Sequence, residues 1–316
     1  MKYVGIQTQV WNNNLKSTIL LLMFPVVLLG LAWLFIYFTR PEHHTIDDVH
    51  YTFAGAVPWI IAGVLIWFLI AWYANTSMIR MATGAKPLER KENKRVYNLV
   101  ENLSIDAGMK MPKVNIIEDN SLNAFASGIN QKTYTITLTR GIINKLNDEE
   151  LEGVIAHELN HIRNRDVRLL IVSIIFVGIF AVLVQVILRS FIYSSMMRGR
   201  GGGGGGRNRG LVMLIALALA IVGFFITSLF RFAISRKREY MADAGAAQLT
   251  KRPDALASAL RKISQKPKVE GVTRKDVSQL FIENPKESQK DLFSFFNGLF
   301  ATHPPIEKRI AVLEQF

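Results

Sequence analysis

The residues of this sequence best suited to chemistry are His157, Glu158 and His161, which form the pattern H-E-x-x-H. Residues four apart share one face of a helix, so the two imidazoles can bind the same metal ion. Glu158 follows the first histidine and can hydrogen-bond a water molecule at that metal without binding the metal itself. Two nitrogen ligands, an open coordination position and an adjacent carboxylate are the requirements of a zinc hydrolase. The motif therefore predicts metal-dependent hydrolysis.

The segment around the motif, residues 148–163, is predicted to be a largely buried helix. H-E-x-x-H also arises by chance on the solvated face of charged helices. The flanking residues argue against that alternative because they are apolar: Leu151, Val154, Ile155, Ala156, Leu159 and Ile162. Buried histidines and a buried glutamate need partners, which a metal ion supplies. Asn147 is expected to cap this helix, with Glu150 completing a capping box.

A third metal ligand must come from elsewhere in the chain, because two histidines leave a zinc site one protein ligand short. The best candidate is Glu239, which lies four residues before Asp243 on a predicted helix. One of these carboxylates can bind the metal while the other orients an imidazole through its free N–H. The alternative is a pair of surface carboxylates beside basic residues, which is the commoner situation in such a charged segment.

The hydrophobic stretches of the chain are long enough to cross a membrane. Half of the 316 residues are apolar, and the sequence contains no cysteine. A helix needs about 20 apolar residues to cross a hydrocarbon core of about 30 Å, and four stretches meet this requirement: 18–38, 53–73, 169–188 and 211–230. The first is too long for the apolar part of a signal peptide, and no small-residue cleavage site follows it. The lack of cysteine excludes disulfides and thiolate metal ligands, which leaves histidine and carboxylate ligands.

These stretches predict how the chain is organised. Residues 1–75 would hold two transmembrane helices, 76–168 the first part of a catalytic domain, 169–230 a transmembrane hairpin with a glycine-rich loop, and 231–316 the second part with the third ligand. The stretch after the second span is rich in Lys and Arg, so the positive-inside rule places both catalytic parts in the cytoplasm. The loop of the hairpin is also basic although it should lie outside. That conflict leaves open whether the hairpin crosses the membrane fully.

The two water-soluble parts are expected to form one composite domain of the α+β class, because neither holds the whole ligand set. A helix over residues 90–107 and a strand over 113–118 are predicted, followed by a hairpin that joins 123–128 to 133–139. The second hairpin strand alternates between threonines and apolar residues. An edge strand just before the metal helix could offer backbone hydrogen bonds to an extended peptide, although an ordinary hairpin explains the pattern slightly better.

The net charge of +13 raises the question of nucleic-acid binding. The basic residues lie mainly beside the predicted membrane segments, where they suit anionic lipid head groups. No nucleic-acid fold signature accompanies them. The expected partner of this charge is therefore the lipid bilayer, and no nucleic acid is expected to bind.

Taken together, these features resemble the HtpX-type membrane zinc endopeptidases, which are related to the CAAX prenyl endopeptidases and to a mitochondrial inner-membrane protease. The resemblance spans nearly the whole chain and rests on the hydrophobic segments and on residues 123–128, 157–161, 235–243 and 302–304. It implies a mainly helical integral membrane protein with four transmembrane helices and a composite zincin-like protease domain. It also implies one Zn²⁺ per chain and a multi-pass protein of the inner membrane whose catalytic domain faces the cytoplasm.

The metal site of the resembled family maps directly onto this sequence. Glu158 matches the catalytic base, and His157 and His161 match two zinc ligands. Glu239 matches the third zinc ligand, and Asp243 lies where the family has an acid that contacts a ligand.

Other positions match the family outside the metal site. Asn123 matches a substrate-binding position on an edge strand, followed by Ala124 and Phe125. His303 and Arg309 match a His-Pro and Arg pair near the site, where either could stabilise a transition state. From the residues alone, a histidine at the start of a helix is the better explanation of His303.

The resemblance implies endoproteolysis of polypeptides, and the spacing of the motifs suggests which ones. His161 lies eight residues before the third span, so at 1.5 Å per helical residue the metal should lie within about 10–15 Å of the membrane surface. Misfolded or damaged membrane proteins are therefore the expected substrates, in a quality-control or stress role.

Three alternatives were open from the sequence. A CAAX-type prenyl endopeptidase would share the chemistry, but those relatives have more spans. A membrane adaptor with a structural metal would not need Glu158. A transporter would need ionisable residues inside its spans, and these spans carry almost none.

Overall fold

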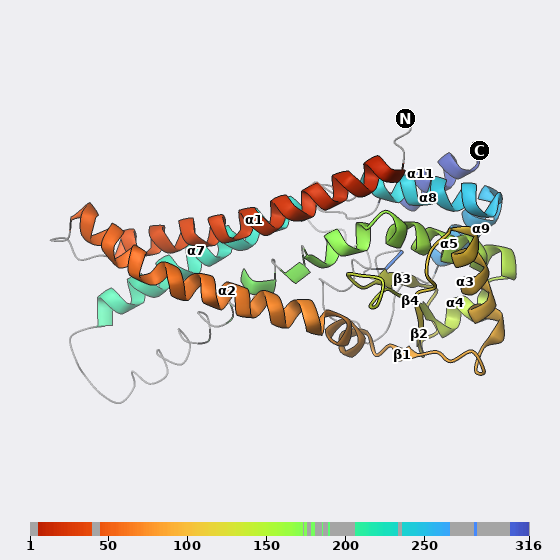
Figure 1. Ribbon diagram of the computed structural model, residues 1–316, viewed down its shortest axis with the longest axis horizontal. Coiled ribbons are helices and arrows are strands. Elements are labelled where there is room, and N and C mark those ends of the chain that lie inside the picture. The colour runs from red at the N-terminus through yellow and green to blue at the C-terminus, as the bar shows by residue number, and fades with distance from the viewer. Residues whose placement is uncertain are drawn as a thin grey trace. The chain divides into compact units, whose positions relative to one another are not determined.

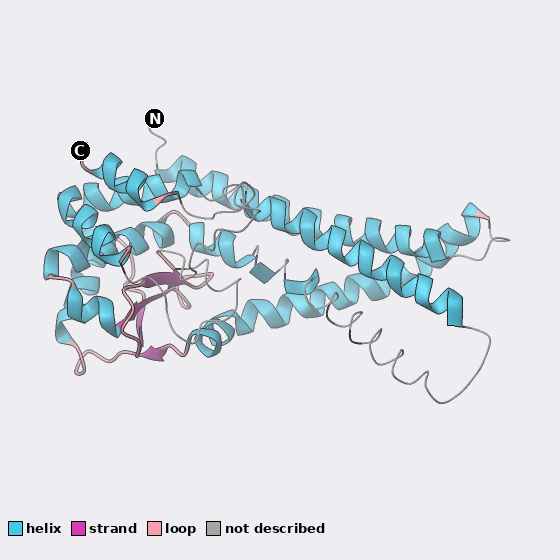
Figure 2. Cartoon of the chain, turned by 180° about the vertical axis from the view of Figure 1, so that it is seen from behind, coloured by secondary structure: helices cyan, strands magenta, loops and turns pink. Residues whose placement is uncertain are grey.

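The computed structural model describes residues 6–39, 45–172, 174–175, 178–180, 185, 189, 206–232, 236–265, 281–282 and 304–315. The chain forms two compact units that are discontinuous in sequence. The first comprises Met1–Ser17, Ala74–Ile171 and Phe232–Phe316, and the second comprises Thr18–Tyr73 and Val172–Arg231. Helices dominate the chain, and one small mixed sheet accompanies them (Figures 1 and 2).

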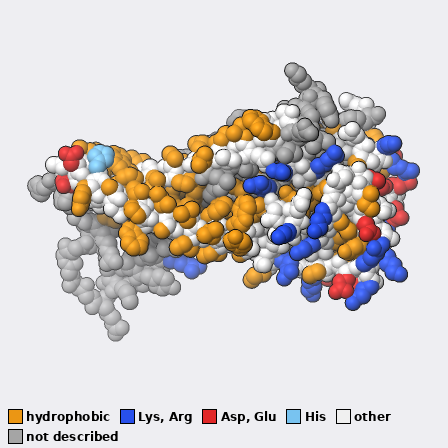
Figure 3. Space-filling model, in the orientation of Figure 1, with side chains coloured by type: hydrophobic (Ala, Val, Ile, Leu, Met, Phe, Trp, Pro, Cys, Tyr) orange, Lys and Arg blue, Asp and Glu red, His pale blue; other side chains and the backbone are white. Residues whose placement is uncertain are grey.

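The long apolar helices are α1 (Ile6–Thr39), α2 (Ile46–Thr83) and α7 (Gly206–Phe232). In the part of the chain that the structure describes, two segments are long and apolar enough to cross a membrane: Leu22–Thr39 and Ile46–Thr83. A shorter apolar stretch, Gly210–Phe225, lies within α7. Hydrophobic side chains cover the visible surface of the long helices (Figure 3). Three of the four predicted spans thus coincide with helices.

Two details of the second unit bear on the predicted transmembrane hairpin. Helix α7 begins at Gly206, inside the predicted glycine-rich loop, so the helix takes in the last residues of that loop. Half of the predicted third span, 169–188, lies outside the described residues, but 169–172, 174–175 and 178–180 are helical. Phe180 packs edge-to-face against Phe24 of α1 with ring centroids 5.6 Å apart. A side chain at Gly223 of α7 would collide with the Phe180 ring, so this segment packs between α1 and α7.

The sheet of the first unit has four short strands in the order β1-β2-β4-β3, which are labelled in Figure 1. They are β1 (Lys86–Pro87), β2 (Lys113–Ile117), β3 (Ala124–Ser127) and β4 (Thr135–Thr139). Strand β2 runs parallel to β4, whereas β3 pairs with β4 antiparallel. The predicted hairpin is confirmed by this β3–β4 pair, and Gly128 leaves β3 with a φ of 106° that favours glycine. The two-residue strand β1 was not predicted.

Among the described residues of the first unit, six shorter helices accompany the sheet. They are α3 (Lys94–Asp106), α4 (Arg140–Lys145), α5 (Asp148–Arg163), α8 (Arg236–Thr250), α9 (Pro253–Ile263) and α11 (Ile306–Leu313). Helix α5 is the centre of this unit, because α3, α8, α9 and β3 all contact it. It has the predicted bounds and the predicted capping box between Asn147 and Glu150. A side chain at Gly245 of α8 would collide with Asn160 of α5, so the two helices can approach closely only because that residue is glycine.

Candidate active site

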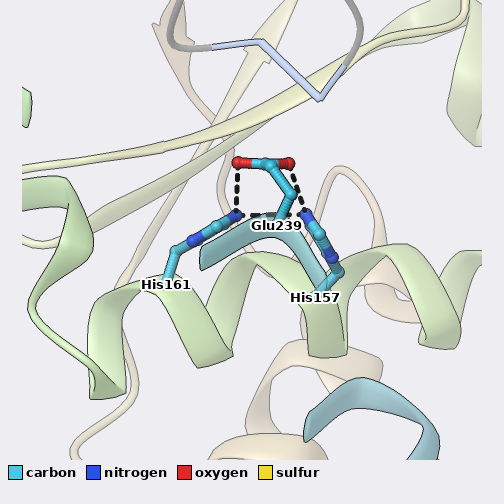
Figure 4. A group of neighbouring side chains, drawn as sticks. All are labelled: His157, His161 and Glu239. Carbon is cyan, nitrogen blue, oxygen red and sulfur yellow. Dashed lines mark hydrogen bonds and ion pairs between the residues drawn. The ribbon is translucent and has the colours of Figure 1, made fainter. Parts of the chain in front are cut away.

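Helices α5 and α8 bring three candidate metal ligands together (Figure 4). His157 and His161 lie one turn apart on α5, and their Nε2 atoms are 3.1 Å from each other. Glu239, in the first turn of α8, places Oε2 3.8 Å from Nε2 of His157 and Oε1 3.6 Å from Nε2 of His161. One ligand atom from each residue lies within 4.8 Å of the others. His161 and Glu239, which are 78 positions apart in the sequence, are thus neighbours in the fold.

The chemistry of this donor set fits a divalent metal ion. Two nitrogens bound to one tetrahedral zinc ion at about 2.0–2.1 Å would lie about 3.3 Å apart, close to the 3.1 Å between the two imidazoles. Imidazole nitrogen and carboxylate oxygen are both ligands that zinc accepts. His157 is fully buried and Glu239 is 6% exposed, so burial removes water as an alternative partner for these groups.

Asp243 contacts the ring of His157 on the side away from the ligand atom. Its Oδ1 lies 2.9 Å from Nδ1 of His157. Arg309, from α11, donates two hydrogen bonds to the same carboxylate, from Nε at 2.9 Å and from Nη2 at 2.7 Å. A carboxylate on Nδ1 keeps the proton at that atom, and Nε2 is then left to face the metal.

Asp166 contacts His161 in the same way, with Oδ2 3.1 Å from Nδ1. It was not a sequence candidate. Five residues of continuous helix turn through about 500°, which places residues 161 and 166 about 140° apart around the axis. Helix α5 ends at Arg163, however, and Arg165 adopts a φ of 58°, in the left-handed region. This turn brings Asp166 back beneath His161, and a helical projection of the sequence cannot show it.

The charges around the site set the protonation of its residues in the metal-free protein. Burial lowers the pKa of His157 to about 4, against the opposing effect of Asp243. Burial also disfavours charge on His161, but Glu239, Asp166 and Glu158 outweigh it and raise the pKa of His161 to about 9. Burial would raise the pKa of Asp243, yet Arg309 and His157 lower it to about 2. His157 is therefore neutral at pH 7, while Asp243 and His161 are charged.

A small hollow of about 40 Å³ adjoins the candidate ligands. Five charged or titratable residues line it: Glu158, His161, Asp166, Arg238 and Glu239. Five apolar residues complete the lining: Ala126, Val167, Leu170, Phe281 and Ile282. Glu158 is 2% exposed and lies next to His157 on α5. A base placed beside the ligands and at the edge of a hollow can reach a reacting group bound there.

The predicted substrate-binding residues, Asn123 just before β3 and Ala124 and Phe125 within it, are all buried. Asn123 donates its backbone N–H to Thr139 Oγ1, and the Phe125 ring packs edge-to-face on Phe281 at 4.8 Å. The carbonyl of Ala124 accepts a 2.8 Å hydrogen bond from the N–H of Ile282. Alternate residues of an edge strand point their backbone groups outward. The carbonyl of Asn123 accepts the backbone N–H of Thr139 next to β4, whereas the carbonyl of Ala124 is bonded to Ile282. The outward residues of β3 are therefore Ala124 and Ala126.

Of the two remaining candidates, Arg309 and His303, the structure describes only Arg309. Arg309 is fully buried and bonded to Asp243, and its Nη1 lies 3.6 Å from Oε2 of Glu239. His303 lies outside the described residues.

Comparisons with known proteins show to which family the chain belongs. The sequence profile described as "Peptidase family M48" matches residues 90–316. A relative named "Protease HtpX homolog" from Bacteroides fragilis (strain YCH46) is 60% identical over 324 residues, covering 100% of both chains. A protein of the same name from Dictyoglomus turgidum is 40% identical over 257 residues, covering 78% of this chain and 80% of its own. The crystal structure of S. mikatae Ste24p aligns with 96% of this chain and 66% of that chain, with a TM-score of 0.48 and 16% identity.

The profile covers most of Ala74–Ile171 and all of Phe232–Phe316, the two longer parts of the first unit, including all three candidate ligands. The Bacteroides relative matches the chain from end to end. The chain therefore belongs to peptidase family M48, with the HtpX-type proteases, and is a metallopeptidase.

Proposed function

We propose that this chain is a membrane-anchored zinc endopeptidase that cleaves misfolded or damaged membrane proteins at the cytoplasmic face of the inner membrane. The observation that carries the proposal is the cluster of His157, His161 and Glu239, with Glu158 beside it on the same buried helix. This arrangement provides two imidazoles and one carboxylate as ligands, together with a second carboxylate as a base. A structural metal site would not need that base.

In the proposed reaction, His157, His161 and Glu239 hold one Zn²⁺ per chain. When bound, zinc supplies Lewis-acid chemistry that makes water more acidic and polarises a peptide carbonyl. Glu158 takes the proton from the attacking water and passes it to the leaving amine. Asp243 keeps the proton of His157 on Nδ1, and Arg309 holds Asp243 in place.

Arg309 is better placed to position other residues than to contact substrate. It is fully buried and makes two hydrogen bonds to Asp243. We therefore assign it to the support of His157 in place of the transition-state role that the resemblance offered. His303 stays a sequence-based candidate for that role.

The proposed substrate is an extended peptide that pairs with the outer edge of β3, where Asn123, Ala124 and Phe125 were predicted to act. Two observations refine the proposal. The carbonyl of Ala124 is already bonded to Ile282, and Ala126 lines the hollow beside Glu158. We therefore assign the backbone of Ala126 to the substrate peptide. Asn123 supports the strand through its bond to Thr139.

The proposed membrane topology has four transmembrane helices, with residues 76–168 and 231–316 in the cytoplasm. The apolar length of α1 and α2 supports the first two, and α7 with the packed Phe180 segment supports the hairpin. Anionic lipid head groups are the proposed partners of the basic residues beside these helices.

The proposal is tested by incubating the detergent-solubilised full chain with an unfolded membrane protein. Wild type is assayed with zinc and with a chelator, beside the variant Glu158→Gln, which should bind zinc and lack the base. Zinc-dependent cleavage that disappears in Glu158→Gln supports the proposed function. Equal behaviour of wild type and Glu158→Gln, with metal bound to both, would indicate a structural metal site.

A further inference from the structure

Asp166 connects the two helices that carry the candidate ligands. Its Oδ2 lies 3.1 Å from Nδ1 of His161 on α5. Its backbone carbonyl accepts a 3.2 Å hydrogen bond from Nη1 of Arg238, and the same Nη1 lies 3.7 Å from Oδ1 of Asp166. Arg238 directly precedes Glu239 on α8. Arg238, which holds the partner of His161, is therefore the sequence neighbour of the third candidate ligand.

All three side chains of this contact are largely shielded from water. The side chains of Asp166, Arg238 and His161 are 4%, 10% and 13% exposed. An ionised carboxylate is costly to bury unless it is paired and hydrogen-bonded, and here an arginine and an imidazole N–H provide those partners. Charge-assisted hydrogen bonds of this kind fix geometry more strongly than neutral ones.

The backbone before Asp166 adopts an unfavourable conformation to make this contact. Arg165 has a φ of 58°, a region that non-glycine residues rarely occupy. Nη1 of Arg165 donates a 3.1 Å hydrogen bond to Oδ1 of Asn14, which holds the turn from outside. The turn follows the end of α5 and places the Asp166 carboxylate within hydrogen-bond distance of Nδ1 of His161.

We propose that Asp166 is the positioning residue of His161, and that Arg238 couples its placement to Glu239. With its proton held on Nδ1 by Asp166, His161 presents Nε2 to the metal. Each histidine ligand then has its own supporting pair, Asp243 with Arg309 for His157 and Asp166 with Arg238 for His161. This inference rests on the proposed zinc site.

A purely structural role for Asp166 makes a different prediction. Asp166 is also the first residue of the helical stretch 166–172, and an acidic residue at the start of a helix stabilises it. That role would affect the stability of the metal-free protein and leave the zinc affinity of the folded protein unchanged. Zinc affinity and stability must therefore be measured separately.

The experiment compares zinc dissociation constants, obtained by competition with a chromophoric chelator, for the full chain in detergent. Loss of an outer partner of a metal ligand weakens binding by about 10–100-fold, and we expect this loss for Asp166→Ala. Asp166→Asn keeps the shape and one acceptor oxygen, so we expect a smaller loss. Asp148→Ala is the matched control, because Asp148 is likewise an acidic residue at the start of a helix, here α5, but is exposed and paired with Arg95.

A spectroscopic measurement tests whether a loss of zinc affinity comes from a change in the geometry of the metal ligands. Cobalt(II) in place of zinc gives visible bands that report ligand geometry, and these bands should shift in Asp166→Ala and not in Asp148→Ala. Thermal unfolding of the metal-free proteins shows whether each variant is folded.

The outcomes separate this inference from the proposed function. If wild type binds no zinc, the proposed function itself fails. If wild type binds zinc and folded Asp166→Ala binds it equally tightly with unchanged cobalt bands, the positioning role of Asp166 is overturned while the proposed zinc site stands.

Discussion

Arg309 and Asp243 form a two-point hydrogen-bonded pair, at 2.9 and 2.7 Å, in which the arginine is completely shielded from water. The pair joins α11 to α8, and through Asp243 it reaches His157 of α5. Three helices from distant parts of the sequence thus meet at one carboxylate. The stability of the fold and the geometry of the candidate metal site depend on the same contact.

Replacing Arg309 with methionine should therefore lower both stability and zinc affinity. Removing one partner of a buried ion pair leaves the other charge uncompensated, at a cost of about 3–5 kcal/mol. Denaturant unfolding of the metal-free protein measures the first effect, and chelator competition measures the second. Glu314→Ala is the control, because Glu314 of the same C-terminal region forms an exposed pair with Arg261, worth about 0–1 kcal/mol. Equal stability of the two variants would contradict the prediction.

Glu239→Ala should lose more zinc affinity than any variant of a supporting residue. Loss of a supporting residue costs about 10–100-fold, whereas loss of a ligand removes a metal bond itself. Equilibrium dialysis followed by elemental analysis measures the bound zinc. Glu149→Ala serves as the control, because Glu149 is exposed and paired with Arg252. Full zinc occupancy in Glu239→Ala would exclude this residue as the third ligand.

Glu150 should make the fold sensitive to acid. Burial would raise its pKa, but hydrogen bonds from Lys262, Ser258 and Asn147 outweigh this and lower it. A carboxyl whose pKa is lower in the folded state stabilises the fold above its unfolded pKa, about 4.3, and loses that contribution as the pH falls through the folded pKa.

The measurement is the free energy of unfolding of wild type and Glu150→Gln as a function of pH. We expect a difference of about 1–3 kcal/mol at pH 7, which shrinks as the pH falls below about 4.3. Glu149→Gln is the control and should show a small difference at every pH. If the difference in free energy of unfolding between wild type and Glu150→Gln stayed constant down to pH 3, Glu150 would not have a lowered pKa in the folded protein.

Ala126→Pro should impair cleavage and leave zinc binding intact. The N–H of Ala126 points away from β4, and proline is tolerated on an edge strand where the missing N–H faces outward. Loss of one hydrogen bond to the substrate peptide should lower kcat/KM by about 3–10-fold. Ala126→Ser keeps the N–H and is the matched control. If Ala126→Pro cleaves as well as Ala126→Ser, substrate does not pair with this residue.

Much of the fold was predictable because its signals are local. The helix around His157 was predicted with its exact bounds because its start carries a capping box and its interior an apolar face. The β3–β4 hairpin followed from the strict alternation of its second strand, with the turn expected around Asn130 and Gln131. The strand β1 was missed because two residues, Lys86 and Pro87, carry no periodicity.

The site was predictable where helical spacing carries information and not where the chain bends. His157 and His161 share a helix face, so their proximity follows from their spacing. Asp166 could not be found in this way, because its contact with His161 depends on the left-handed conformation of Arg165. That arginine gives no sequence signal, since glycine or asparagine is the residue expected in such a conformation. The burial of Arg309 against Asp243 likewise depends on long-range packing.

The separation of α5 and α8 in the sequence has a consequence for the biogenesis of the protein. Between these two helices the chain runs through the second unit, from Val172 to Arg231. In the proposed topology, that intervening stretch must be inserted into the bilayer before Glu239 can return to the two histidines. A chain still being inserted has only two of the three candidate ligands in place. The enzyme would therefore stay inactive until its own membrane insertion is complete, and unfinished copies could not digest their neighbours.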